Sequence, residues 1–330
     1  SALGDYLIFG GLIKAVEKYS DARCIVIHRG NLNVSLWPYG DYRDRFFSIF
    51  SARELIFFFR TLHQYKKQGY EIFGIQMFPG SLQGFFLFSF LKAFKLLNFR
   101  VDFNLVNADI ITPPRGSYIY DIHLNQAATL TAAVFPDQAY QLTLPLRLNQ
   151  PPKPLEPSPP AVAIHPWSRR GDTAPFTWNK EQWAELISFI VKSQNLRVLV
   201  FGRDSGFNDF QNYLTKKLGH HANKIVFYPS ANVHELINSV QQANLIICPN
   251  TSVAHIGKAL DKKMIILSGP SLEYWTPRGK DIHIVRDIEA TFPGNDRPIN
   301  DPRFPSIRRI PVATICRIIE NIQLTCTRET

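Results

Sequence analysis

Short apolar runs alternate with amphipathic patterns along the second half of the chain. The run at 196–202 is short, apolar and closed by a glycine, as buried strands are, whereas 179–193 repeats apolar residues at helical spacing. The expected strands are 161–166, 196–202, 224–229, 244–250 and 263–271, and the expected helices are 179–193, 209–219, 232–243 and 252–260. This order predicts a parallel sheet with helices on both faces.

Side-chain type marks the buried face and the ends of several of these helices. Gly219 is a stop signal for the helix at 209–219, and Asn232 is a plausible N-cap for the helix that follows. The apolar face of 179–193 consists of Trp183, Leu186, Ile187 and Ile190. We expect these four side chains to pack against the sheet.

The first half has a similar but less regular pattern. Helices are expected at 4–20, 51–69 and 80–97, and strands at 23–28 and 70–77. Ser51, with Glu54 three residues later, forms a capping-box pattern at the start of the second helix. The fold class expected for the whole chain is α/β, with two Rossmann-like doubly wound domains whose strand ends face a central cleft, where ligands of such sheets bind.

A proline-rich stretch at 149–160 separates the two halves. It contains six prolines in twelve residues, a composition that neither a helix nor a central strand accommodates. We therefore expect an N-terminal domain over 1–150, a semi-rigid linker over 151–160 and a C-terminal domain over 161–330. The last helix of the chain can pack back on the N-terminal domain.

Composition is that of a globular protein. Of 330 residues, 45% are hydrophobic and 19% charged, and no apolar run is long enough for a transmembrane helix. The four cysteines lie far apart, which favours reduced thiols in a cytoplasmic protein over a disulfide framework.

No signal peptide is visible. The first helical pattern starts so close to Ser1 that we expect further residues upstream.

The net charge of +10 favours partners that carry several negative charges. Lysine and arginine are scattered and form no dense basic run, so phosphorylated sugars and anionic membranes rank above nucleic acid, which is not expected as a partner. A basic protein without any such partner has the same composition, so charge alone does not decide.

Asp5 follows Gly4 near the start of the first expected helix. One interpretation is an ordinary helix cap. The other is a catalytic carboxylate that removes a proton from a hydroxyl, because a helix N-terminus keeps a carboxylate ionised. Spacing alone favours the cap. The glycines nearby also lack the GxGxxG spacing of a dinucleotide site, which disfavours an oxidoreductase.

A polar cluster follows the apolar strand at 244–250. Asn250, Thr251 and Ser252 open the next helix, and His255 lies within its first turn. The free N–H groups of a helix end, together with hydroxyl side chains, bind phosphate. An N-cap beside a buried histidine is the plainer explanation for any one of these residues, whereas the full cluster favours phosphate binding.

Three further loops follow strands and carry chemistry of the same kind. Residues 165–178 contain a hydroxyl and two guanidinium groups suited to a diphosphate, at Ser168, Arg169 and Arg170. Arg203 and Asp204 could reach a ribose or a phosphate, and residues 269–279 form a Pro/Gly-rich loop of the type that covers ligands. For each of these loops, an exposed or packed surface loop without a ligand is the alternative interpretation.

Phenylalanine is concentrated in the first half of the chain. Most of these side chains must form core. A minority lie near basic residues and could form a surface that touches anionic lipid. The basic residues concerned are Arg43, Arg45, Arg53, Arg60, Lys92 and Lys95.

Together these motifs resemble glycosyltransferase family 9, the bacterial heptosyltransferases of lipopolysaccharide core assembly. The similarity runs over most of the chain: Gly4 and Asp5 before an apolar helix, "AIHPWSRR…FTWNKEQWAEL" at the start of the second domain, and "LIICPNTSVAHIGKALDKKMIILSGPS" followed by "GPSLEYWTPRG". The resemblance implies a GT-B fold and an inverting, metal-independent enzyme without a cofactor. Its substrate would be a nucleotide-diphospho-sugar, ADP-heptose as the first guess, and its acceptor a lipid-linked glycan.

The resemblance also implies roles for particular residues. Asp5 would be the general base, and the N-terminal domain would bind the acceptor. The C-terminal domain would hold the donor through Asn250, Thr251, Ser252 and His255, with Arg169 or Arg170 on the leaving diphosphate. Such an enzyme would work in the cytoplasm, at the inner face of the cytoplasmic membrane of a Gram-negative bacterium, as a peripheral membrane protein.

The chain departs from the family pattern at several positions. The acidic residue and the glycine of the family's DTG motif are Asn250 and Ser252 here, and the family's phosphate-binding lysine has no counterpart near Phe176 and Thr177. The donor sugar is therefore open. A nucleotide-sugar epimerase or hydrolase of the same fold, and a non-catalytic nucleotide-sugar-binding protein, remain alternatives to the transferase.

Overall fold

The computed structural model describes residues 3–28, 46–48, 52–70, 74–75, 101–102, 124, 134–136, 160–167, 176–202, 206–229, 233–269, 276–287 and 306–322. Contacts divide the chain into two compact units, Ser1–Arg147 and Leu148–Thr330. The proline-rich stretch follows the division closely, but only Pro160 of it is described.

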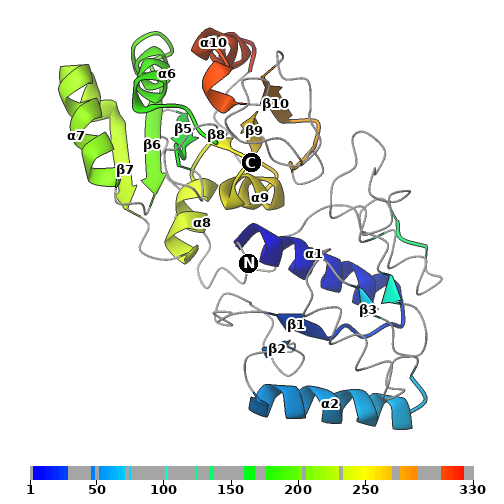
Figure 1. Cartoon of the computed structure of the whole chain (residues 1–330). Coiled ribbons are helices and arrows are strands. Elements are labelled where there is room, and N and C mark those ends of the chain that lie inside the picture. Colours follow the sequence, from blue (N-terminus) through cyan, green and yellow to red (C-terminus); the bar gives the residue numbers. More distant parts are fainter. Residues whose placement is uncertain are drawn as a thin grey trace, which may run out of the picture. The chain divides into compact units, whose positions relative to one another are not determined.

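A six-stranded parallel sheet forms the centre of the second unit among its described residues (Figure 1). Its strands stand in the order β10-β9-β8-β5-β6-β7, so β5 and β8 are neighbours in the middle although six other elements separate them along the chain. The strand bounds are β5 Ala161–Ile164, β6 Arg197–Gly202, β7 Ile225–Pro229, β8 Leu245–Pro249, β9 Lys263–Ser268 and β10 Ile282–Arg286. The chain builds outward from β5 in one direction and then outward from β8 in the other, which is the doubly wound arrangement that the sequence predicts.

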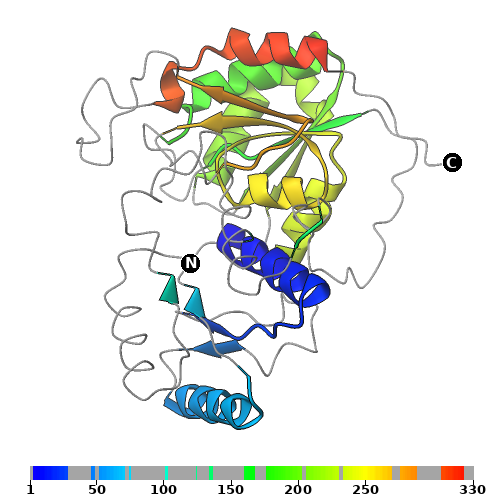
Figure 2. The same ribbon diagram turned by 90° about the vertical axis from the view of Figure 1, so that its right-hand side faces the viewer.

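Helices cover both faces of this sheet (Figure 2). The helices α6, α7 and α10 share one core with the sheet, whereas α8 and α9 pack on the other face. Their bounds are α6 Lys180–Lys192, α7 Phe207–Leu218, α8 Val233–Gln241, α9 Ser252–Ala259 and α10 Val312–Asn321, with short 3₁₀ turns at Gly219–Lys224 and Ile307–Arg309. Helices on both faces bury both sides of the four inner strands, β9, β8, β5 and β6, and the sequences of these strands are therefore continuous apolar runs.

The structure of α6 confirms its sequence signals. Asn179 is the N-cap, and its side chain and that of Gln182 exchange hydrogen bonds with each other's backbone in a capping box. The predicted apolar face, Trp183, Leu186, Ile187 and Ile190, is fully buried. Gly219 likewise ends α7 with a positive φ of 55°, a conformation that glycine adopts without strain. Asn232 lies outside the described residues.

Two elements of the second unit were not located from the sequence, although a last helix was expected. The strand β10 pairs with β9, and α10 packs against α6 with Ile315 and Ile319 in the shared core. The indole Nε1 of Trp178 also donates to the carbonyl of Ile310 at 2.9 Å, ahead of α10. The described part of the last helix therefore belongs to the core of the second unit.

The first unit contains two helices and two pairs of short parallel strands among its described residues. The helices are α1 Leu3–Tyr19 and α2 Ala52–Lys67, and the strands are β1 Val26–His28, β2 Phe46–Ser48, β3 Gly74–Ile75 and β4 Val101–Asp102. The expected helices at 4–20 and 51–69 are present, and short strands lie within the ranges expected as strands at 23–28 and 70–77. The expected helix at 80–97 and the cap residue Ser51 lie outside the described residues.

Cysteines and helix lengths agree with the composition. Cys24, Cys248 and Cys316 are free thiols, and burial raises the pKa of the Cys248 thiol far above its ordinary value. Among the helices that the structure describes, none has both the length and the apolar character that a bilayer crossing needs.

Candidate functional site

The candidate site lies where β5 and β8 meet in the sheet. The chain leaves β5 towards α6 on one face and leaves β8 towards α9 on the other, so the connections that follow these two strands run to opposite faces of the sheet. The register pairs Ile164 with Ile247, and the backbone N–H of His165 donates to the Ile247 carbonyl at 3.2 Å. Open α/β sheets bind ligands in the crevice at such a reversal of strand order. Two of the polar stretches named from the sequence, 165–170 and 250–255, follow these two strands.

Thr251 occupies the N-cap position of α9, but its side chain does not cap the helix. Its backbone is extended, with φ −134° and ψ −179°, and its carbonyl accepts the N–H of Ala254 at 3.0 Å. Its hydroxyl Oγ1 is buried and has no hydrogen-bond partner among the described residues. An N-cap threonine ordinarily gives its side-chain oxygen to the first turn. The Thr251 side chain therefore does not cap the helix, and its hydroxyl is a buried polar group without a described partner, which is uncommon in folded proteins.

Asn250 is held by a hydroxyl from the loop that follows β9. Its amide Nδ2 donates to Oγ1 of Thr276 at 2.9 Å, and Oγ1 of Thr276 lies 3.5 Å from Oγ of Ser268. Thr276 and Ser268 are both buried, so water does not compete for these contacts. The contact ties the Asn250 amide to the segment that follows β9. Sequence reasoning named residues 269–279 as a ligand-covering loop but missed Thr276, because its partner lies 26 residues away.

His255 is buried in the first turns of α9. The residue is 6% exposed, and loss of solvent lowers the pKa of its imidazole to about 4. The ring is therefore neutral at pH 7. A neutral imidazole can donate one hydrogen bond and accept another, but it adds no positive charge for a phosphate.

Acid is expected to destabilise the fold through His255. Its pKa of about 4 in the folded protein lies below the ordinary 6.5, so the unfolded chain binds more protons between these values. The free energy of unfolding should therefore decrease as the pH is lowered through this window. For this one group the decrease should be about 2 kcal/mol between pH 7 and pH 5. Urea unfolding of the wild type and of His255→Gln measures this, and the variant should show a shallower pH dependence. If the free energy of unfolding depended equally on pH in the two proteins, the lowered pKa of His255 would be contradicted.

His165 is a second histidine of the site that sequence reasoning did not single out. It follows β5 directly, its Nδ1 is buried without a partner among the described residues, and burial lowers the pKa of its ring to about 4. Its ring lies 6.0 Å from the ring of Phe201 and 6.1 Å from that of Trp167. The sequence signal that could have identified His165 is its position in "AVAIHP", at the end of the first expected strand of the second half.

The segment after β5 is fixed by packing on β6. Trp167 is buried, and a side-chain carbon on Gly202 would lie 2.4 Å from its ring, so only glycine fits at the end of β6. Oγ1 of Thr177 donates to the carbonyl of Pro166 at 2.6 Å and accepts from Nε1 of Trp183 at 3.2 Å. Thr177 is fully buried, so it anchors this segment and does not replace the family's phosphate-binding lysine.

Several predicted site residues cannot be placed by their side chains. Asp5 lies in the first turn of α1, which starts at Leu3, so its backbone is at a helix N-terminus as predicted, but its side chain lies outside the described part of the structure. Ser168, Arg169, Arg170, Arg203 and Asp204 also lie outside it. Of the predicted donor-binding residues, the structure brings Asn250, Thr251, Ser252 and His255 together at the end of β8.

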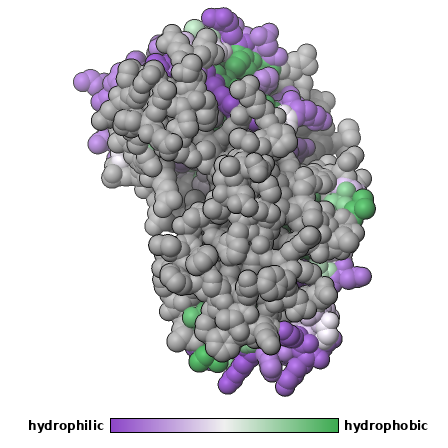
Figure 3. Space-filling model, turned by 45° about the vertical axis from the view of Figure 1, so that its right-hand side comes forward, coloured by the Kyte–Doolittle hydropathy of each residue, from purple (hydrophilic) through white to green (hydrophobic). Residues whose placement is uncertain are grey.

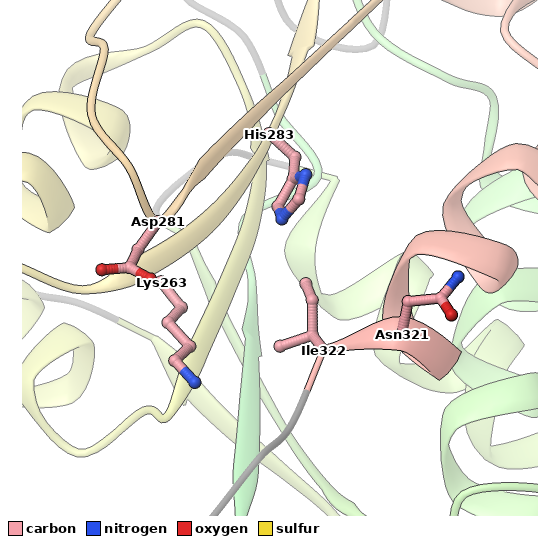
Figure 4. A pocket seen from close by; sticks show the side chains of 5 residues that line it. All are labelled: Lys263, Asp281, His283, Asn321 and Ile322. Carbon is pink, nitrogen blue, oxygen red and sulfur yellow. The ribbon is translucent and has the colours of Figure 1, made fainter.

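A separate hollow lies at the opposite end of the strands. It measures about 190 Å³ and lies at the starts of β9 and β10 and at the end of α10, where Lys263, Asp281, His283, Asn321 and Ile322 line it (Figure 4). In Figure 4, Lys263 and Asp281 lie on one side of it and the α10 residues on the other. Ligands of parallel sheets bind at the carboxyl ends of strands. This hollow is therefore not part of the candidate site. No group of three potential metal ligands occurs among the described residues.

Comparisons with known proteins agree with this geometry. Residues 78–297 match the family model "Glycosyltransferase family 9 (heptosyltransferase)". No curated protein sequence matches the chain. Among solved structures, a family 9 glycosyltransferase from Veillonella parvula has a TM-score of 0.67 at 11% identity, covering 97% of this chain and 94% of its own.

Two E. coli enzymes are similar over the same extent. Heptosyltransferase WaaC, solved with ADP-2-deoxy-2-fluoro heptose, has a TM-score of 0.58 at 14% identity and covers 97% of both chains. ADP-heptose lps heptosyltransferase II has a TM-score of 0.60 at 13% identity, covering 97% of this chain and 96% of its own. These likenesses establish the fold, and the family match covers most of the sequence. The chain is therefore an α/β protein of the GT-B fold and belongs to glycosyltransferase family 9.

Proposed function

We propose that this glycosyltransferase is inverting and metal-independent and moves a heptose-like sugar from a nucleotide-diphospho-sugar, with ADP-heptose as the first candidate donor. The acceptor is a hydroxyl of a lipopolysaccharide core or a related glycan. The observation that carries the proposal is the buried Thr251 hydroxyl, which has no described partner and lies at the N-terminus of α9, beside the reversal of strand order. The ADP-heptose analogue in the WaaC structure supports the choice of donor.

The second unit binds the donor in this proposal. The first N–H groups of α9 and the Thr251 hydroxyl donate to the diphosphate, and the positive end of the helix dipole favours its charge. Ser168, Arg169 and Arg170 add a hydroxyl and two guanidinium groups after β5. These donors stabilise the leaving nucleotide diphosphate in place of a metal ion.

Asn250 and His255 are proposed to contact the sugar as neutral groups. The amide nitrogen of Asn250 donates to Thr276. A carboxamide carries both a donor and an acceptor, and sugar hydroxyl groups pair with either. The carboxylate that the family carries at this position would accept hydrogen bonds only, and it would repel the diphosphate. Asp204 accepts from a ribose hydroxyl after β6.

The first unit binds the acceptor and supplies the base. The carboxylate of Asp5 takes the proton of the acceptor hydroxyl, while that oxygen forms a bond to the anomeric carbon from the face opposite the diphosphate. The bond between the anomeric carbon and the diphosphate oxygen breaks with its electron pair on the leaving nucleotide diphosphate. The anomeric configuration is thereby inverted. The N-terminus of α1 stabilises the ionised form that a base requires.

The test of donor binding uses Thr251. Thr251→Val removes the hydroxyl and keeps the shape, so affinity for ADP and for ADP-heptose should fall roughly 10-fold or more, as expected for loss of a hydrogen bond to a charged group. Calorimetry and ligand-induced thermal shifts measure this. Thr251→Ser, which keeps the hydroxyl, is the matched control and should bind almost as the wild type does.

The same variant separates binding from folding. Because Oγ1 of Thr251 has no described partner, Thr251→Val without ligand should melt at or above the wild-type temperature. A valine variant that binds donor as tightly as the wild type would contradict the role of this hydroxyl.

Turnover assays distinguish the transferase from the alternatives. Release of nucleotide diphosphate should require both donor and acceptor and persist with EDTA, and NMR of the product should show an inverted anomeric centre. Release without acceptor would indicate a hydrolase, and binding without any release would indicate a sugar-nucleotide-binding protein.

A further inference from the structure

The helix α2 has one outward face that the rest of the first unit leaves exposed. Its inner side buries Phe58 and Leu62, which are 4% and 3% exposed. On the outer side, Ile56 is 53% exposed and Phe57 is 49% exposed. The exposed positions recur at helical spacing and form one stripe, called the α2 face below: Arg53, Ile56, Phe57, Arg60, His63, Gln64 and Lys67.

The charges on the α2 face all have one sign. Arg53 and Arg60 lie about one turn to either side of the apolar pair, and Lys67 lies two turns further on. The seven positions include no acidic residue, and Glu54, in the first turn, is only half-exposed. In Figure 3, hydrophobic and hydrophilic atoms lie side by side at the foot of the view, where Figure 1 places α2.

We propose that the α2 face docks on the surface of an anionic phospholipid bilayer. A helix lying in the interface inserts apolar side chains among the acyl chains and places cations among the headgroups, and here Ile56 and Phe57 would do the first and Arg53, Arg60 and Lys67 the second. The net charge of +10 acts in the same direction at longer range.

Charge argues against a second copy of the chain as the occupant of this face. A two-fold contact brings the same face of both copies together, so three cations would meet three cations with no acid between them. A bilayer rich in anionic headgroups complements the cations and accepts the two exposed apolar side chains. The inference is independent of the proposed reaction, since lipid binding is measured without donor or acceptor.

The experiment is co-sedimentation of the full chain with two kinds of vesicle, one of phosphatidylcholine alone and one that also contains phosphatidylglycerol. Wild type should bind the anionic vesicles and bind the neutral ones much more weakly. Each cation at an anionic surface contributes about fivefold in affinity, so the triple variant Arg53→Gln/Arg60→Gln/Lys67→Gln should lose on the order of 100-fold. The double variant Ile56→Ser/Phe57→Ser should also lose at least tenfold, which charge alone would not produce.

The matched control removes three exposed lysines from the second unit, as Lys192→Gln/Lys216→Gln/Lys217→Gln. It lowers the net charge equally and should bind anionic vesicles within a few-fold of the wild type. Circular dichroism and melting temperature check that each variant is folded.

Three results would overturn the proposal. In the first, the α2 variants sediment with vesicles as the wild type does. In the second, the control loses as much affinity as the triple variant, which would mean that net charge acts without a specific face. In the third, the wild type ignores vesicles and the Ile56/Phe57 variant changes the oligomeric state, which would assign the face to contact between copies of the chain.

Discussion

Asp5→Asn is expected to lower kcat on the order of 1,000-fold, within the range by which general bases accelerate proton transfer. The amide matches the carboxylate in shape but cannot take the proton from the acceptor hydroxyl. Donor affinity should stay the same, because the proposed diphosphate ligands belong to the other unit. Steady-state kinetics with ADP-heptose and a glycan acceptor, together with donor binding by calorimetry, measure both quantities.

A second acid near α1 provides the control for Asp5. Asp21→Asn removes an exposed carboxylate just after the C-terminus of α1 and should leave kcat unchanged. Wild-type turnover by Asp5→Asn would refute the assignment of the base, even if donor binding behaves as proposed. A loss of donor affinity in Asp5→Asn would instead indicate a binding role for this carboxylate.

Arg309→Met is expected to destabilise the second unit by about 3 kcal/mol. Nε and Nη2 of Arg309 lie 2.6 and 2.5 Å from Oδ2 of Asp287, and the Ser306 N–H donates to the same oxygen at 3.1 Å. The side chain of Asp287 is 2% exposed and that of Arg309 is 33% exposed. Removing the arginine takes a counter-ion away from a buried carboxylate. Such losses cost about 3–5 kcal/mol, and the partial exposure of Arg309 favours the lower end.

The ion pair matters because it joins the end of β10 to the segment that leads into α10. Urea unfolding of Arg309→Met, Asp287→Asn and the double variant measures it, and the double variant should regain part of the loss because no charge is left buried. Arg317→Met, on an exposed position of α10, should change the free energy of unfolding by less than about 0.5 kcal/mol. Additive effects of the two single substitutions would mean that the pair is not coupled.

The local sequence pattern was sufficient to predict the helices and strands whose caps and buried faces are formed by residues of the same segment. In α6, the cap, the capping-box partner and the buried face all follow from residues within one segment, and the structure confirms the predicted helix and its face. The order of strands and helices in the second unit was predicted for the same reason. The strand β10 was missed, and the last helix was expected but not located. β10 is an edge strand with partly exposed residues and a weak apolar pattern, and α10 is placed by contacts with α6 and Trp178.

The candidate site likewise has some features that local sequence signals predict and others that depend on contacts between distant residues. That Asn250, Thr251, Ser252 and His255 begin a helix directly after a strand follows from the sequence, because strand ends and helix starts carry local signals. The contact of Asn250 with Thr276 joins residues 26 positions apart, and the anchoring of Pro166 by Thr177 joins residues 11 apart. Neither pair has a spacing that a periodic pattern would reveal.

By itself, then, the sequence determined the α/β class, the parallel second unit and a polar cluster at a strand-to-helix junction, since periodicity and caps are properties of neighbouring residues. Only the tertiary structure decided that β5 and β8 are neighbours, that the Thr251 hydroxyl leaves its helix uncapped, and that His255 is neutral. The physical reason is that strand order, hydrogen-bond satisfaction and desolvation depend on what packs around a group. Those neighbours come from distant parts of the chain.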